Sequence, residues 1–193
     1  MEHAEIKIAG FGGQGVIMAG VIIGKAASIF NDYHATMIQS FGPEARGSAC
    51  SAQVIVDKAP IAYPYVEQSS ILVALNQEAY KLFAPTLKKD GILIYEKDMV
   101  TPDPSEGNGV RLFGVPATRI AEELGRVIVQ NVVMVGFFAA VTDLLSYEAV
   151  ENAVRDSIPK GTDSLNLEAL KRGYDYGLEL LNAAPRGTAV SKD

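Results

Sequence analysis

Short apolar runs alternate along the chain with longer stretches in which apolar residues recur every three or four positions. The short runs are typical of buried strands and the longer stretches of helices. The expected strands are residues 6–10, 34–39, 49–56, 70–75, 92–96 and 110–115. The expected helices are residues 16–30, 76–89, 117–124, 126–141, 146–158 and 165–181. This alternation predicts an α/β fold with a mostly parallel sheet, helices on both faces and a helical C-terminal part.

Single residues indicate where some of these elements begin and end. Asn76 stands where a helix cap is expected, and Pro85 is expected to kink or end the helix that follows. Gly91 is expected to close that helix before the strand at 92–96. The first four strands are apolar or β-branched enough to predict central positions in the sheet.

Composition and hydropathy restrict size and location. The 193 residues are 48% hydrophobic, which suits one domain, expected over residues 1–183 with a flexible tail at 184–193. The apolar run at 126–141 is shorter than the roughly 20 residues that span a bilayer, and it contains Gln130 and Asn131, so a buried helix is expected. The N-terminal segment lacks the pattern of a signal peptide, which predicts the cytoplasm.

Charge and cysteine content narrow the functional classes. Lys and Arg number 17 against 23 Asp and Glu, and the formal charge of −6 argues against nucleic acid as a partner. Cys50 is the only cysteine and the chain has two histidines, so it is not expected to hold an iron–sulfur cluster or a metal ion by itself. Cys50 lies among small residues and is expected to be a packing residue rather than a redox thiol.

The segment IKIAGFGGQG, residues 6–15, carries a glycine motif. Residues 10–15 satisfy G-x-G-x-x-G between a strand and a helix, where the motif places an anion at the helix N-terminus. Rossmann domains that bind nucleotides also carry an acidic residue at the end of the second strand. Here Asp32 precedes that strand, and Gln39 and Ser40 end it. Two interpretations stay open: a loop for NAD, FAD or a related cofactor in a free-standing oxidoreductase, and a tight turn without ligand.

The segment QSFGPEARGSACS, residues 39–51, is expected at the same edge of the sheet as the glycine motif. Pro43 and Gly47 restrict its backbone, and it carries Glu44 and Arg46. These two side chains could form a local surface ion pair. Alternatively, a guanidinium on a rigid loop suits a partner or a phosphate-bearing ligand.

Six segments, in order, resemble the gamma subunit, or gamma domain, of the 2-oxoacid:ferredoxin (acceptor) oxidoreductases. They are GFGGQGVIMAG, QSFGPEARGSACSAQVIV, IAYPYV, LVALNQEAY, GILIYE and VQNVVMVGFFAAV. The resemblance extends from about residue 6 to about residue 175, and the pairing of GGQG with GPEARG is more specific than a glycine motif alone. Within the family, SFGPEARG followed by LNQEAY is most similar to the 2-oxoglutarate branch, with a branched-chain 2-oxoacid or pyruvate as alternatives.

The resemblance implies a Rossmann-like accessory subunit that is inactive alone. Complexes of this family decarboxylate a 2-oxoacid oxidatively with coenzyme A to give an acyl-CoA. They use thiamine diphosphate, Mg and iron–sulfur clusters, and they pass electrons to ferredoxin or another acceptor. The resemblance places these cofactors on alpha, beta and ferredoxin-like delta subunits, so no catalytic residue and no cofactor is expected on this chain alone.

The resemblance also implies a ligand or subunit-interface site at the edge with the two loops. The expected backbone contacts come from Gly12, Gly13, Gln14 and Gly15, and the expected polar side chains are Gln39, Ser40, Glu44 and Arg46. Asn76 and Asn131 are further candidates, although a helix cap or a core hydrogen bond would also explain them. The apolar, tyrosine-bearing segment at 61–68 predicts self-association of the isolated chain.

Overall fold

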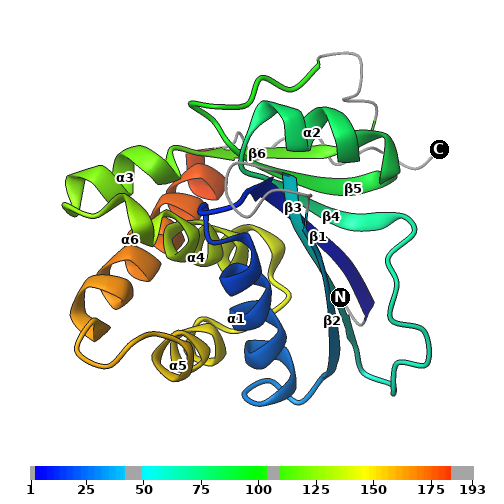
Figure 1. The fold of residues 1–193 in the computed structure, drawn as a ribbon, viewed down its shortest axis with the longest axis horizontal. Coiled ribbons are helices and arrows are strands. Elements are labelled where there is room, and N and C mark those ends of the chain that lie inside the picture. The colour runs from blue at the N-terminus through cyan, green and yellow to red at the C-terminus, as the bar shows by residue number, and fades with distance from the viewer. Residues whose placement is uncertain (1–2, 42–48, 104–108, 184–193) are drawn as a thin grey trace.

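A six-stranded sheet forms the centre of the fold (Figure 1). The computed structural model describes residues 3–41, 49–103 and 109–183, so the expected tail lies outside the described residues. The strands lie in the spatial order β2-β3-β1-β4-β5-β6. Their bounds are β1 His3–Phe11, β2 His34–Phe41, β3 Ala49–Asp57, β4 Ser69–Ala74, β5 Leu87–Glu96 and β6 Arg111–Val115. Every expected strand is therefore present.

The sheet is mostly parallel, as expected. β1, β4, β5 and β6 pair in parallel, whereas β3 lies antiparallel between β1 and β2. β2 is an edge strand, so the expected central position is wrong for this element. Its sequence HATMIQSF carries polar residues on both faces, and each of its side chains is half-buried or exposed, which an edge position permits.

Helices cover both faces of the sheet, but unequally (Figure 1). α2 lies on one face and the other helices lie on the opposite face. The bounds are α1 Val16–Ser28, α2 Gln77–Phe83, α3 Ala117–Glu123, α4 Gln130–Thr142, α5 Tyr147–Ser157 and α6 Asp163–Ala183. Successive side chains of a strand point to opposite faces of the sheet. Leu72 of β4 packs with Tyr80 of α2, whereas the preceding Ile71 faces the larger core.

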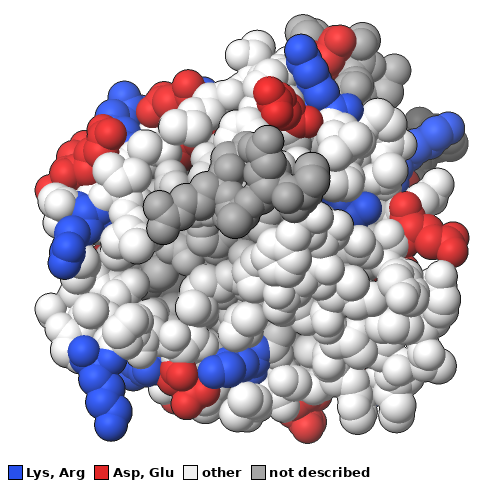
Figure 2. All heavy atoms as spheres, viewed as in Figure 1, with Lys and Arg blue, Asp and Glu red and all other residues white. Residues whose placement is uncertain are grey.

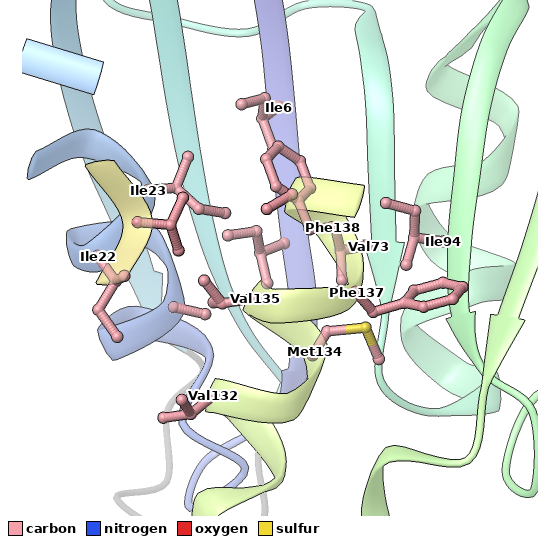
Figure 3. Close-up of a cluster of buried hydrophobic side chains, with 14 of the residues drawn as sticks. Ile6, Ile22, Ile23, Val73, Ile94, Val132, Met134, Val135, Phe137 and Phe138 are labelled. Atoms are coloured by element: carbon pink, nitrogen blue, oxygen red, sulfur yellow. The ribbon is translucent and has the colours of Figure 1, made fainter. Parts of the chain in front are cut away.

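The larger core lies between the sheet and α4. Figure 3 shows Met134, Phe137 and Phe138 of α4 among side chains from the strands and α1, including Ile6 and Ile94. Residues 131–142 of α4 are all buried, which confirms most of the helix expected at 126–141. Its start is wrong, because Val127–Val129 form a separate 3-10 turn in which Val127 and Ile128 are exposed. Among the described residues, no helix is long and apolar enough to cross a membrane.

α4 and α6 approach each other through glycine. A Cβ atom on Gly136 of α4 would overlap the carbonyl oxygen of Leu170, and one on Gly173 of α6 would overlap that of Val133. Any side chain at either position would therefore force the helices apart. This crossing fixes the C-terminal helix to the core.

The region after α2 differs from the expectation. α2 ends at Phe83, two residues before Pro85, which confirms the expected break. β5 then begins at Leu87, so residues 87–89 are strand rather than helix. Gly91 does not close a helix, because it lies inside β5 near a register shift with β4. A Cβ atom there would meet the Leu87 side chain and two backbone carbonyl oxygens, so close packing explains this glycine.

Candidate functional site at the carboxyl edge of the sheet

The glycine loop joins the end of β1 to the first turn of α1. Gly13 and Gly15 have φ angles of 100° and 74°, in the left-handed region that favours glycine. A Cβ atom on Gly15 would come within 2.6 Å of the Asn131 side chain on α4. Backbone conformation and close packing therefore account for these two glycines, and the motif alone does not indicate a nucleotide.

Gln14 closes this loop with its side-chain amide. Its Oε1 accepts hydrogen bonds from the Phe11 backbone N–H at 2.7 Å and from Asn76 Nδ2 at 3.0 Å. Its Nε2 donates to the Leu75 carbonyl oxygen at 3.3 Å. The amide of Gln14 thus links the ends of β1 and β4, two neighbouring parallel strands. Its hydrogen-bonding groups are directed at the protein itself, so Gln14 holds the loop in shape.

The two candidate asparagines extend the same network. Asn76 caps α2, because its Oδ1 accepts a hydrogen bond from the Ala79 backbone N–H at 2.8 Å. Asn131 is 6% exposed, and its Nδ2 donates to the Gly15 carbonyl oxygen at 3.4 Å. Both side chains therefore have structural partners, and they bring α2 and α4 to the glycine loop.

The end of β2 lies farther from this network. Gln39 and Ser40 are exposed and point to opposite faces of β2, and β3 separates them from β1. Glu44 and Arg46 lie outside the described residues. The flanking residues are described: Phe41 pairs with Cys50, and Ala49 pairs with Phe11 at the end of β1. Both ends of the segment 42–48 therefore start from the edge that carries the glycine loop.

Asp32 lies at the other end of the sheet. It has a φ of 51° in the turn before β2, two residues ahead of the strand. Nucleotide-binding folds hold the ribose at the carboxyl ends of their strands. Asp32 is therefore in the wrong place to serve the glycine loop, as its sequence position indicated.

A buried carboxylate at this edge was not among the expected site residues. Glu96, the last residue of β5, is 2% exposed. Its two oxygens accept hydrogen bonds from the Asp98 backbone N–H at 3.2 Å and the Thr118 backbone N–H at 2.9 Å. The Thr118 hydroxyl donates to Gln130 Oε1 at 2.9 Å, which connects Glu96 to the first residue of α4. Burial raises the pKa of the Glu96 carboxyl, and the two backbone N–H groups oppose that shift. The signal in the sequence was a single charge directly after the apolar ILIY.

The described candidate residues form a network of polar contacts. Burial raises the pKa of the Cys50 thiol, and a protonated thiol is a poor nucleophile. Within residues 3–41, 49–103 and 109–183, no three His, Cys, Asp or Glu side chains are grouped so that they could hold a metal ion. Amides and one buried carboxylate can position a loop, a ligand or a partner chain.

Known proteins are similar in sequence to this chain over most of its length. Residues 5–176 match the family model described as pyruvate ferredoxin/flavodoxin oxidoreductase. The chain is 42% identical over 177 residues to a Methanocaldococcus jannaschii protein named 2-oxoglutarate synthase subunit KorC, which covers 91% of this chain and 95% of that protein. Other similar proteins are named ketoisovalerate oxidoreductase subunit VorA and pyruvate synthase subunit PorC.

Solved structures share the fold. The keto/oxoacid ferredoxin oxidoreductase gamma subunit of Geobacter sulfurreducens has a TM-score of 0.79 and 36% identity, covering 91% of this chain and 99% of that chain. A 2-oxoglutarate:ferredoxin oxidoreductase from Magnetococcus marinus, solved with 2-oxoglutarate, coenzyme A and succinyl-CoA bound, has a TM-score of 0.83. At 22% identity, over 96% of this chain and 32% of that one, it shows the fold alone. The resemblance seen in the motifs is confirmed: the chain belongs to the pyruvate ferredoxin/flavodoxin oxidoreductase family, as a gamma subunit of the 2-oxoacid:ferredoxin oxidoreductases.

Proposed function

We propose that this chain serves a cytoplasmic complex that converts 2-oxoglutarate and coenzyme A to succinyl-CoA, carbon dioxide and reduced ferredoxin. The choice of 2-oxoglutarate as substrate rests on the 42% identity to a 2-oxoglutarate synthase subunit across nearly the whole of both chains. The bound ligands of the Magnetococcus marinus enzyme, which shares the fold, are consistent with the same reactants.

The proposed complex divides its chemistry among subunits. Alpha, beta and ferredoxin-like delta subunits would hold thiamine diphosphate, Mg and the iron–sulfur clusters, and coenzyme A would enter as a substrate. Cys50 is the only cysteine of this chain and is buried, which supports placing the clusters on companions. The thiamine cofactor would supply the carbanion chemistry of decarboxylation.

The contribution of this chain is to present a rigid edge to the companions or to coenzyme A. The amide of Gln14 fixes the glycine loop, and Asn76 and Asn131 tie α2 and α4 to it. The resemblance adds Glu44 and Arg46 to this edge, where a guanidinium could bind a phosphate of coenzyme A or a carboxylate of a partner. A free-standing dinucleotide-binding enzyme is less well supported, because β2 ends without a carboxylate.

Purification of the tagged chain from its native source tests this proposal. We expect companion chains to co-purify with iron and thiamine diphosphate, and we expect the complex to reduce ferredoxin when 2-oxoglutarate and coenzyme A are both present. Pyruvate and 3-methyl-2-oxobutanoate serve as comparison substrates. We expect the kcat/KM for each to be lower than that for 2-oxoglutarate by about tenfold or more, which corresponds to about 1.4 kcal/mol. A higher kcat/KM for either comparison substrate would contradict the proposal that 2-oxoglutarate is the substrate. If the chain purifies without any companion that carries a cofactor, the proposal that it belongs to such a complex is contradicted.

A further inference from the structure

β2 exposes an unpaired edge of the sheet. One side of β2 pairs with β3 along all eight residues, and no strand among the described residues pairs with its other side. Its sequence HATMIQSF contains no Lys, Arg, Asp, Glu or Pro, and its register with β3 is regular from His34 to Phe41. Natural proteins protect edge strands with charges, proline, bulges or short length. β2 has none of these features.

The opposite edge strand shows the contrast. β6 has five residues, begins with Arg111, contains Gly114 and is followed by Pro116. A short strand with a charge and a glycine is a poor template for further pairing. The two edges of this sheet therefore differ in their capacity to accept another strand, and only β2 offers a long, uncharged row of backbone groups.

Charges beside β2 gather at its His34 end, where Asp32 and Lys58 lie, and the surface farther along carries little charge. Figure 2 shows a broad area without charged side chains at the lower right, where Figure 1 places β1, β2 and the connection from β3 to β4. That connection carries Tyr63 and Tyr65, which are 58% and 54% exposed with ring centroids 5.4 Å apart. It packs on the α2 side of the sheet, where the Val66 backbone N–H donates to Gln53 Oε1 at 3.0 Å. Exposed tyrosines are enriched at protein interfaces.

Backbone and charge together indicate a second copy of this chain as the occupant. Unpaired N–H and C=O groups along eight residues are a template for pairing with another strand. Two copies of one strand bring identical side chains together, and because β2 contains no Lys, Arg, Asp or Glu, no like charges face each other when it pairs with itself, although each chain carries a formal charge of −6. A strand that pairs antiparallel with its own copy forms an isologous contact, in which one patch serves both partners. We propose that β2 pairs with β2 of a second chain about a twofold axis, which joins the two sheets into one.

The alternation of side chains limits the register of this pairing. Met37 faces the larger core, where it is opposite Val54, whereas Ile38 faces the α2 side, opposite Gln53. Residues directly opposite each other in an antiparallel pair lie on the same face of the sheet. The twofold axis must therefore pass between the two copies of one residue, so that this residue lies opposite itself. The registers that use most of β2 place Met37 or Ile38 at this position. In either register the two copies of Ile38 lie opposite or diagonal to each other, within roughly 8 Å.

A charge exchange at Ile38 tests this interface on the isolated full-length chain. We expect the wild-type chain to sediment at about twice its 20.6 kDa. Ile38→Lys and Ile38→Glu should each weaken self-association by about tenfold or more, because like charges meet across the axis. An equimolar mixture of the two variants should recover the dimer, since opposite charges then face each other. That recovery also requires both variants to be folded.

The control is the same pair of substitutions at Leu112 on β6, which is 43% exposed and should leave the mass unchanged. A wild-type monomer overturns the proposal, and so does a dimer that survives both Ile38 variants. A mixture that stays monomeric also overturns it. None of these readouts involves a 2-oxoacid or coenzyme A, so the outcome is independent of the proposed function.

Discussion

At the scale of single residues, the glycine loop depends on Gln14. We predict that Gln14→Ala destabilises the chain by about 1–3 kcal/mol, because the Phe11 N–H and the Asn76 amide each lose their acceptor in a partly buried position. Urea unfolding measures this difference. Gln39→Ala removes the same side chain from an exposed site on β2 and should change stability by less than about 0.5 kcal/mol. Equal effects of the two substitutions would mean that the loop does not rely on the amide.

The sequence predicts that some of these residues share one edge of the sheet, but it does not predict their hydrogen bonds or the burial of Glu96. The glycine loop and Asn76 follow parallel strands, so the shared edge could be predicted from strand order alone. The bond between Gln14 and Asn76 could not, because no pattern states which way an amide points. Glu96 was overlooked because one carboxylate after an apolar run reads as the solvent-exposed end of a strand. Its 2% exposure and its hydrogen bond from the Thr118 backbone N–H of α3 arise only in the folded chain.

At the scale of elements, the crossing of α4 and α6 depends on glycine. We predict that Gly173→Ala destabilises the chain by about 3 kcal/mol or more, because the new methyl group overlaps the Val133 carbonyl oxygen and backbone cannot yield as a side chain can. Thermal or urea unfolding measures the loss.

The matched control for this crossing is Gly24→Ala in α1. A Cβ atom on Gly24 meets nothing within 4 Å, so alanine should stabilise the helix by about 0.5–1 kcal/mol. The opposite signs separate close packing from helix propensity. A stabilising Gly173→Ala would show that the helices can move apart without cost.

Element boundaries show where local patterns fail. The helical periodicity of residues 76–89 extended too far, because residues 87–89 belong to β5. Lysines are common in helices, so the sequence around Lys88 favoured a helix, whereas pairing with β4 and an ion pair to Glu5 at 2.5 Å favour the strand. The edge position of β2 likewise follows from the insertion of β3 between β1 and β2, a pairing that no local pattern encodes.

At the scale of the whole molecule, the fold combines a motif typical of nucleotide binding with a site built for other contacts. Gln14 directs its hydrogen bonds into the protein, the Asn131 side chain packs against Gly15, and β2 ends in Gln39 and Ser40 without a carboxylate. Asp32, the acidic residue about twenty residues after the glycine motif, lies at the opposite end of β2. Two requirements of dinucleotide binding, an open loop and an acid for the ribose, are thus unmet among the described residues.

We therefore predict that the isolated chain binds neither NAD nor NADP and has no oxidoreductase activity, whereas the complex purified from the native source is active. Calorimetric titration of the isolated chain with NAD and NADP should give no heat of binding up to a Kd of about 1 mM, which corresponds to only about 4 kcal/mol. The native complex, assayed with 2-oxoglutarate and coenzyme A, shows that the same chain is functional when its companions are present. Micromolar binding of NAD or NADP by the chain alone would favour a free-standing dinucleotide enzyme, because a family accessory subunit has no use for that affinity.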